Sequence, residues 1–276
     1  MIHGGTGGRP DRGRLARIRR SLRAICEDAY AYLETRSAVD GVRFAVRRLE
    51  DDPLFNAGTG SVLQRDGKVR MSASIMDGAL RRFSAVLNIE GVRYPVDVAS
   101  ALQGEEDRVL AGSGAVRFAR EQGIAPWNSV TPVRLHQWQR RVRDRSAQGT
   151  VGAIALDVDG RLAAATSTGG KGFERVGRVS DSGLPVGNYA DDQVAVSCTG
   201  LGEEIVDEAL AVRIAQRVAD GRSLAQALAL TFRELRARER RVGAIGLDRR
   251  GRWAASTTLP VLFAVTRTPA RMTETF

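Results

Sequence analysis

Histidine is almost absent from this sequence. His3 and His136 are the only two histidines among 276 residues. A zinc site built from several histidines is therefore excluded. A Ser-His-Asp or Cys-His mechanism would need one of these two residues in the right place. If the protein is an enzyme, we expect its base to be a different group.

Cysteine and long apolar runs are also scarce. Cys26 and Cys198 form no CxxC motif and no disulfide framework, which is typical of a reduced, cytoplasmic protein. The first residues show no secretion signal, and no apolar run reaches the roughly 18 residues of a membrane span. We therefore expect a cytoplasmic location and no membrane partner.

Lysine is the third scarce residue, although the chain is strongly basic. The net charge is +10, and only Lys68 and Lys171 among the 42 basic residues are lysines. A positive charge of this size raises the hypothesis of nucleic-acid binding. The arginines are scattered through helix-like segments without a basic-aromatic stripe. The sequence therefore favours solvated helix faces over a nucleic-acid interface.

Apolar spacing predicts both helices and hairpins. Strands such as 151–156 are apolar on both faces and need cover on both sides. We therefore predict one domain, residues 1–276, folded as a four-layer α/β/β/α sandwich. Apolar residues at helical spacing predict helices over residues 13–35, 37–50, 95–103, 107–122, 203–219 and 223–239. Turn sequences between apolar runs predict three hairpins, which pair residues 62–64 with 69–75, 151–157 with 162–166, and 242–248 with 253–258.

The second and third predicted hairpins resemble each other. Residues 151–157 read VGAIALD and residues 242–248 read VGAIGLD. We interpret them as two hairpins with the same packing needs rather than as an ancient repeat. The useful point is a difference, because Thr150 precedes the first hairpin and Arg241 precedes the second.

A predicted linker ends at this threonine. Residues 126–149 are polar, arginine-rich and irregular, so we expect an exposed segment that can be cut without unfolding the core. A threonine hydroxyl is a weak nucleophile, and the α-amine of a newly formed N-terminal Thr150 would supply a base in the same residue. Gly149 would allow the strained backbone of an N-to-O acyl shift. A Gly-Thr dipeptide alone carries no signal.

Longer segments carry a family resemblance. Residues 149–170, with 2–7, 51–60, 73–78, 177–182 and 197–203, resemble the plant-type asparaginase/isoaspartyl peptidase family, whose members are Ntn-hydrolases. The resemblance implies self-cleavage between Gly149 and Thr150, which would give an alpha subunit (1–149) and a beta subunit (150–276). It also implies hydrolysis of the side-chain amide of L-asparagine or of β-aspartyl peptide bonds, and a homodimer of processed units.

The resemblance assigns roles in the reaction to five residues. Thr150 would be the nucleophile and, through its amine, the base. Thr168 would hydrogen-bond that nucleophile, and Asn56 would support it from the other subunit. Thr199 and the Gly200 N–H would form the oxyanion hole. From the residues alone, Thr168 reads equally as a strand-end cap, and Thr199-Gly200 as a plain turn before a helix.

The resemblance also assigns binding residues. Arg178 and Asp181 would hold the α-carboxylate and α-ammonium of the substrate, together with Gly202. Without the family, Arg178 and Asp181 read as a surface ion pair. The resemblance implies no catalytic cofactor, but it implies a sodium ion held by main-chain carbonyls, which would be those of Leu49, Glu50, Asp52, Phe55, Ala57 and Thr59.

Some positions depart from the family pattern. Ser180 stands where glycine is common, Gly183 where proline is usual, and Leu201 where threonine is common. These changes affect the expected pocket wall and therefore the substrate preference. Two alternatives stay open: a glycosylasparaginase of the same superfamily, and an inactive scaffold that binds nucleic acid or anions.

Overall fold

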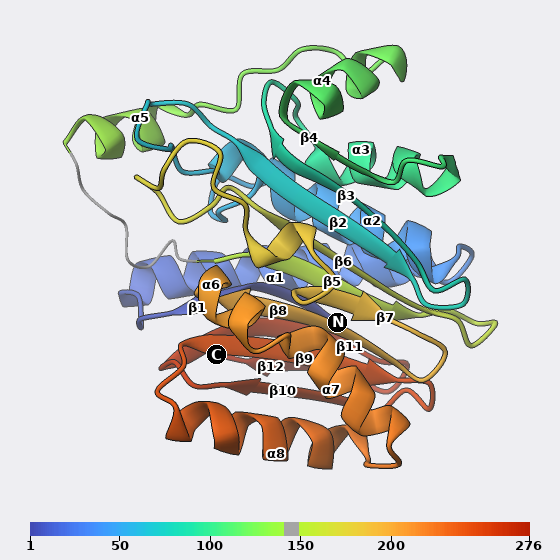
Figure 1. Cartoon of the computed structure of the whole chain (residues 1–276). Coiled ribbons are helices and arrows are strands. Elements are labelled where there is room, and N and C mark those ends of the chain that lie inside the picture. Colours follow the sequence, from blue (N-terminus) through green and yellow to red (C-terminus); the bar gives the residue numbers. More distant parts are fainter. Residues whose placement is uncertain (141–148) are drawn as a thin grey trace.

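Two β-sheets stacked face to face form the centre of the computed structural model, which describes residues 1–140 and 149–276 (Figure 1). The larger sheet has eight strands and the smaller has four. In spatial order the larger sheet contains β12 (Met272–Thr275), β11 (Val261–Arg267), β1 (Ile2–Gly7), β5 (Val151–Leu156), β6 (Leu162–Thr168), β2 (Met71–Asp77), β3 (Arg82–Ile89) and β4 (Val109–Ala111). The smaller contains β10 (Trp253–Thr257), β9 (Val242–Asp248), β8 (Val194–Gly200) and β7 (Asn188–Ala190).

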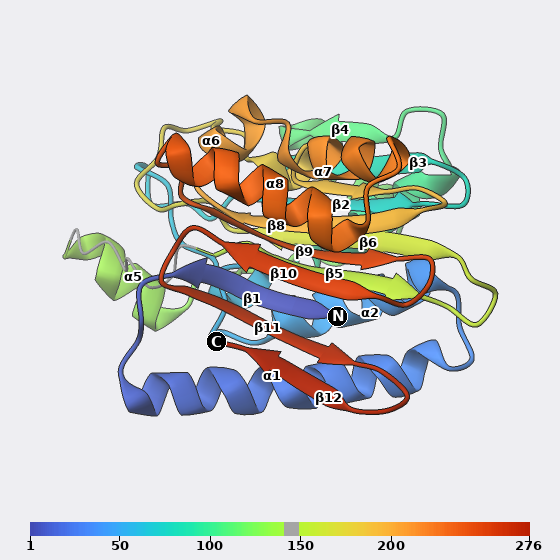
Figure 2. The ribbon, with the colours of Figure 1, turned by 90° about the horizontal axis from the view of Figure 1, so that it is seen from below.

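Helices cover the outer face of each sheet (Figures 1 and 2). The larger sheet is covered by α1 (Arg12–Leu33), α2 (Ala38–Asp51) and α3 (Pro95–Ala101). The smaller sheet is covered by α7 (Leu210–Ala219) and α8 (Leu224–Ala237). The predicted four-layer α/β/β/α sandwich is therefore confirmed. No helix among the described residues is long and apolar enough to cross a membrane.

Strand β5 shows why the sandwich needs four layers. Val151, Ala153 and Ala155 pack on the side of α1 and α2, whereas Ile154 packs between the two sheets. Successive side chains of a strand point to opposite faces, so a strand that is apolar at every position must be covered on both. β6 alternates in the same way and pairs antiparallel with β5.

Two of the three predicted hairpins are confirmed. β5 pairs with β6, and β9 pairs with β10. In both, an aspartate at the turn accepts hydrogen bonds from backbone N–H groups two and four residues further on: Asp157, which follows β5, and Asp248, which ends β9. This shared turn supports the interpretation of two similar hairpins.

The first predicted hairpin is wrong. Gln64 and Lys68 do close a turn by a 2.9 Å backbone hydrogen bond, but residues 61–64 form no strand. β2 pairs instead with β3 on one side and with β6 on the other. Both edges of β2 are therefore occupied, and no edge remains for residues 62–64. The sequence patterns did not identify β3.

Two predicted helices have different bounds. Residues 203–219 form two helices, α6 (Gly202–Asp207) and α7, because Ala209 adopts a left-handed conformation with φ +45°. Residues 107–122 begin with the short strand β4 and continue as α4 (Gly112–Glu121).

The stretch 126–149, which we expected to be irregular, contains α5 (Pro132–Gln139). Trp138 donates its indole N–H to the Gln64 carbonyl at 2.9 Å, and Arg134 donates to the Gly60 carbonyl at 2.8 Å. These contacts hold α5 on the domain. Residues 141–148 of the predicted linker lie outside the described residues.

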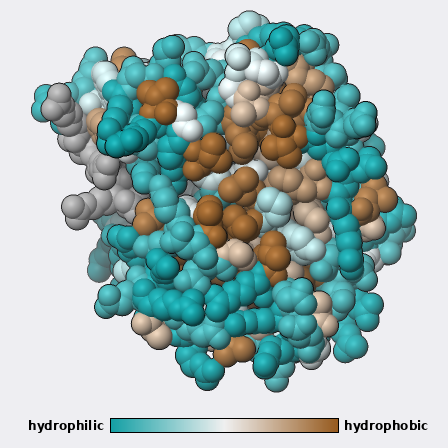
Figure 3. Space-filling model, in the orientation of Figure 1, coloured by the Kyte–Doolittle hydropathy of each residue, from teal (hydrophilic) through white to brown (hydrophobic). Residues whose placement is uncertain are grey.

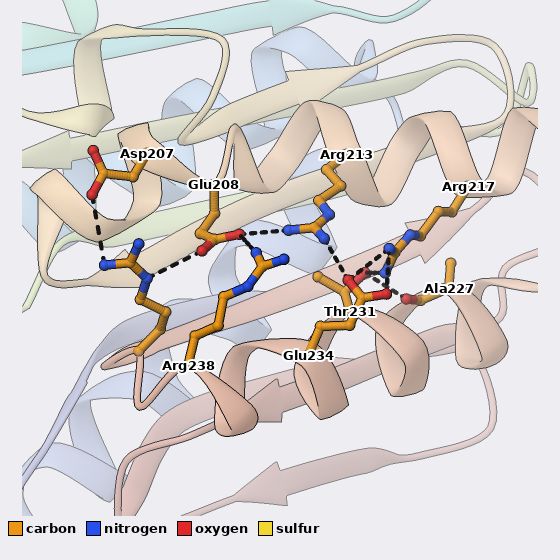
Figure 4. Close-up of polar contacts among 9 residues, drawn as sticks. Asp207, Glu208, Arg213, Arg217, Ala227, Thr231, Glu234 and Arg238 are labelled. Carbon is orange, nitrogen blue, oxygen red and sulfur yellow. Dashed lines mark hydrogen bonds and ion pairs between the residues drawn. The ribbon is translucent and has the colours of Figure 1, made fainter.

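Many arginines serve the fold itself. Glu208, which is buried, accepts hydrogen bonds from Arg213, Arg238 and Arg240 (Figure 4). Arg213 also contacts Glu234 of α8, so the network joins α7 to α8. Burial alone would raise the pKa of Glu208, but Arg240, Arg238 and Arg213 outweigh that effect and hold the pKa below its usual value.

We expect Glu208→Gln to lower the free energy of unfolding by about 2 kcal/mol, because it removes the charge that three arginines share. The neighbouring Asp207→Asn is the control, since Asp207 is exposed and lies 3.6 Å from Arg240. Surface pairs contribute at most about 1 kcal/mol. Urea denaturation of both variants measures the difference. Equal stabilities would show that the network does not hold the helices together.

Candidate active site

A small pocket lies at one end of the sandwich. Thr150 precedes β5, Thr168 ends β6, and Gly200 ends β8. Since Val151 pairs with Ser167, Thr150 lies beside Thr168 in the sheet. The pocket brings together residues that are far apart in the sequence: Gly149, Thr150, Thr168, Gly170, Lys171, Arg178, Ser180, Asp181, Gly200, Leu201 and Gly202.

The Thr150 side chain is buried, and its hydroxyl oxygen lies 3.1 Å from that of Ser182. Thr168, which we expected to hydrogen-bond Thr150, accepts a hydrogen bond from the Gly170 N–H at 3.1 Å. The structure therefore places the two threonines in one pocket but gives Thr150 a serine as its hydroxyl partner.

The expected oxyanion residues lie where β8 leaves the sheet. Gly200 has φ +130°, and a Cβ there would collide with the Arg241 carbonyl, so only glycine fits. Thr199 is fully buried behind it, and its hydroxyl has no hydrogen-bond partner within the described part of the chain. A buried hydroxyl without a partner retains a donor for a group that enters the pocket.

Arg178, Asp181 and Gly202 meet on one wall of the pocket. A Cβ on Gly202 would lie 2.7 Å from both the Arg178 Nη2 and the Asp181 Oδ1. The glycine therefore gives the guanidinium and the carboxylate access to the same space. Arg178 also donates to Glu203, at 3.0 and 3.2 Å. The predicted binding pair does meet, although the ion-pair partner of Arg178 is Glu203.

The two carboxylates on this wall have very different pKa values. Burial raises the pKa of Asp181 to about 7, against the opposing effects of Arg178 and the Ser180 hydroxyl. Burial would also raise the pKa of Glu203, but hydrogen bonds from Arg178 and Lys171 outweigh it and lower the pKa to about 2. The wall thus holds one fixed anion and one carboxyl group that titrates near neutral pH.

Asn56 supports the pocket from behind. Its amide N–H donates to the Gly170 carbonyl at 2.6 Å, and its carbonyl accepts from the Val62 N–H at 3.0 Å. It does not line the pocket itself. Asn56 therefore acts on the position of Gly170, whose N–H is bonded to Thr168.

The expected sodium loop is tightly wound around main-chain oxygens. A Cβ on Gly58 would collide with the Glu50 carbonyl, and one on Gly60 with the Phe55 carbonyl. The carbonyls of Asp52 and Ala57 already accept hydrogen bonds from the turn. In residues 1–140 and 149–276, no cluster of three His, Cys, Asp or Glu side chains could hold a metal ion. Two of the six carbonyls expected to bind sodium are already engaged within the turn.

The sequence patterns missed three contributors. Ser180 was noted only as a departure from the family, and Ser182 only as the end of a motif. Both are buried, and Ser182 contacts Thr150. Glu203 was not singled out, although it binds both Arg178 and Lys171. The alternation Ser180-Asp181-Ser182 was the available signal, but spacing alone cannot show that both hydroxyls point inward.

Neither histidine lines the pocket, although the His3 ring lies close to the Thr150 backbone. His3 is buried in β1 and contacts the Ser197 hydroxyl at 2.8 Å. Burial lowers its pKa to about 3, so it stays neutral at physiological pH. His136 lies exposed on α5. The expectation that the base is another group agrees with both positions.

We expect Asp181 to give stability a specific pH dependence. Between about pH 4 and pH 7, folded wild type keeps a proton on Asp181 that the unfolded chain has released. The free energy of unfolding of wild type should therefore decrease from pH 4 to pH 7. Relative to Asp181→Asn, which has no such group, the decrease should be on the order of 4 kcal/mol. The stability that protonated Asp181 contributes to the folded state is fully present below pH 4 and is lost as pH rises through 7.

Urea titrations at several pH values, with Thr150→Ala as the common background of both proteins, measure this difference. Parallel stability curves for the two proteins would contradict an elevated pKa at Asp181.

Comparison with known proteins agrees with this arrangement. A family model described as asparaginase matches residues 1–276. The isoaspartyl peptidase/L-asparaginase of Nostoc sp. is 45% identical over 96% of this chain and 90% of its own length. That of Synechocystis sp. is 44% identical over 100% and 89%, and that of Homo sapiens 37% identical over 94% and 91%. The chain therefore belongs to the asparaginase family of hydrolases.

Proposed function

We propose that this chain cleaves itself between Gly149 and Thr150 and then hydrolyses the side-chain amide of L-asparagine and β-aspartyl peptide bonds. The observation that carries the proposal is the pocket wall on which Arg178 and Asp181 face the same space over Gly202. A guanidinium fork matches a carboxylate and a carboxylate matches an ammonium, so the wall suits the zwitterionic head of an amino acid. Thr150 lies in the same pocket.

The names of the relatives support this substrate class. The proteins that match at 44% and 45% identity are called isoaspartyl peptidase/L-asparaginase. A glycosylasparaginase of the same superfamily is the alternative within hydrolases. The wall of Arg178 and Asp181 would bind the unmodified α-carboxylate and α-ammonium that both substrate classes carry, so the names of the relatives are what favours the isoaspartyl peptidase/L-asparaginase class.

The size of the pocket supports self-cleavage as the first step. In the intact chain its cavity volume is only about 20 Å³, which is room for about one water molecule. Gly149 lines this pocket. After cleavage, Gly149 would no longer be attached to Thr150, and its departure would open space for a substrate.

The proposed reaction uses the new amine of Thr150. The neutral amine accepts the hydroxyl proton while Oγ attacks the amide carbon of the substrate. The Thr199 hydroxyl and the Gly200 N–H stabilise the oxyanion, at typically 3–4 kcal/mol for each donor. The leaving nitrogen takes the proton and departs as ammonia or as an amino acid. Water then hydrolyses the ester on Thr150 and releases aspartate.

We expect Thr150→Ala to stay a single chain and to be inactive, because it lacks the nucleophile for both steps. Thr150→Ser is the matched control, since it keeps a hydroxyl, and it should still be cut. Intact mass spectrometry would detect pieces of residues 1–149 and 150–276. Wild type that hydrolyses substrate while it remains full-length would show that the mechanism is wrong.

We expect Arg178→Ala to raise KM for L-asparagine and for β-aspartyl-leucine, since a buried charge-assisted contact typically contributes about 2–5 kcal/mol. Self-cleavage should be affected far less, because it involves no substrate carboxylate. Glu203→Gln is the control, because it removes the ion-pair partner of Arg178 and leaves the guanidinium in place. Unchanged KM values in Arg178→Ala would show that Arg178 does not bind the substrate.

We also propose that processed units pair as a homodimer. Apolar side chains gather in the middle of the face seen in Figure 1, over β3, β4 and the segment around η3 (Asp181–Gly183) (Figure 3). Val109, Val179 and Val206 are exposed side chains of β4, of the segment before η3 and of α6. Exposed apolar patches mark interaction surfaces. Light scattering measures the mass, and a monomer at micromolar concentration would contradict the pairing.

The remaining proposals concern a cation and the rival function. The main-chain carbonyls of residues 49–59 would hold a structural sodium ion, and a melting temperature equal in sodium and potassium chloride would argue against it.

The rival function is an inactive scaffold that binds nucleic acid. The pairing of Arg213 and Arg238 with Glu208 speaks against it, and a gel shift with random DNA at physiological salt tests it.

A further inference from the structure

Three buried hydroxyls connect Thr150 to Asp181. The Thr150 Oγ1 lies 3.1 Å from the Ser182 Oγ, which lies 3.2 Å from the Ser180 Oγ. The Ser180 Oγ lies 3.1 Å from the Asp181 Oδ1. All four side chains are at most 5% exposed. The proposed function uses Asp181 only to bind substrate, and this chain of hydrogen bonds has no role in that step.

Counting hydrogens gives the chain a direction. A hydroxyl has one donor and two acceptor positions. The Ser180 hydroxyl lies within donating distance of both the Asp181 carboxylate and the Ser182 oxygen, but it has only one hydrogen. When Asp181 is ionised, that hydrogen goes to the carboxylate, and Ser180 accepts from both the N–H and the hydroxyl of Ser182, whose nitrogen lies 3.2 Å away. The Ser182 oxygen then accepts from the Thr150 hydroxyl. Each hydroxyl in this series of hydrogen bonds therefore donates in the direction of the Asp181 carboxylate.

The intact chain needs such an acceptor. Before cleavage the Thr150 nitrogen is part of the Gly149–Thr150 amide, so it cannot act as a base. We propose that Asp181 is the proton acceptor for self-cleavage, reached from Thr150 through the hydroxyls of Ser182 and Ser180. The inference rests on the proposed function, because it concerns the step that forms the active enzyme.

The proton transfers in this step balance. The Thr150 Oγ bonds to the Gly149 carbonyl carbon, and the electron pair of the C=O bond moves to oxygen. The hydroxyl proton passes to Ser182, that of Ser182 to Ser180, and that of Ser180 to Asp181. The C–N bond then breaks, and the nitrogen takes up the proton equivalent that Asp181 held. Water hydrolyses the resulting ester to the Gly149 carboxylate and the Thr150 hydroxyl.

The surroundings of Asp181 suit an acceptor at neutral pH. Burial raises its pKa to about 7, and an efficient general base has a pKa near the working pH. The charged and titratable groups that face it are Arg178 from its own segment, Glu203 from α6 and Cys198 from β8. Arg178 opposes the rise in the pKa of Asp181 and Glu203 adds to it, while burial keeps the Cys198 thiol neutral.

Asp181 would therefore serve two steps in succession. In the intact chain it takes the proton of Thr150. After cleavage the amine of Thr150 becomes the base, and Asp181 is available for the ammonium of the substrate. Ser180 carries a proton in the first step alone, so it is the position at which the two roles of Asp181 can be separated.

The test compares self-cleavage of wild type, Ser180→Ala and Ser180→Thr during cell-free synthesis, at several pH values. Alanine removes the hydroxyl and adds no atom in its place, whereas threonine keeps the hydroxyl. We expect Ser180→Ala to be cut about 100-fold more slowly, which is at the lower end of general-base effects, and Ser180→Thr to recover most of the rate. The turnover of the fraction that does cleave should fall much less.

The pH profile separates a relay from a structural role. The wild-type cleavage rate should rise as pH passes through about 7, and Ser180→Ala should lose this acid limb. Ser84→Ala is the control, because Ser84 is a buried serine bonded to the Ala99 carbonyl at 2.6 Å. If Ser180→Ala does not fold, Ser182→Ala breaks the next link of the chain and should show the same loss.

Two results would overturn the relay while the proposed function stands. One is Ser180→Ala cleavage within about twofold of wild type, since loss of a working general base costs far more. The other is slow cleavage with an unchanged acid limb, which would place the base elsewhere. Wild type that remains intact at every pH would overturn both the relay and the proposed function.

Discussion

The antiparallel pairing of β5 with β6, in a position buried on both faces, fixes where the site can form. Ile154 packs between the sheets while Val151 and Ala153 pack under the helices, so β5 cannot slip by one residue without exchanging its two faces. The same register sets Thr150 beside Thr168 at the open end of the sheet. The position of the proposed nucleophile is thus a consequence of core packing rather than of a mobile loop.

Charge is used differently beside the outer helices and in the pocket. On the outer helices, Glu208 collects three arginines and joins α7 to α8, so much of the positive charge serves the fold. In the pocket, Arg178 is shared with Glu203 and faces the same space as Asp181. A buried carboxyl without a full complement of partners destabilises the folded state once it is ionised. The presence of such a carboxyl group at Asp181 agrees with a role in chemistry rather than in stability.

Much of the fold followed from local patterns. The apolar runs and the Asp-Gly turn between them predicted the hairpin of β5 and β6, and the helical apolar spacing of residues 13–35 and 37–50 predicted α1 and α2. Prediction failed where a distant partner decides the outcome. Residues 62–64 have a turn but no free strand to pair with, because β3 and β6 take both edges of β2. Ala209 breaks one predicted helix into two by its left-handed backbone, which no local propensity favours.

The sequence by itself determined the chemistry that is available. The scarcity of histidine limits the common mechanisms that use a histidine base, and the motifs around Thr150, Arg178 and Asp181 match one family. It also determined the layered fold, because strands that are apolar at every position require cover on both faces. Only the tertiary structure decided that Ser180 and Ser182 point inward and connect Asp181 to Thr150. Side-chain direction in an irregular segment depends on what packs around it, and here β5, β6, β8 and α6, from distant parts of the chain, form that environment.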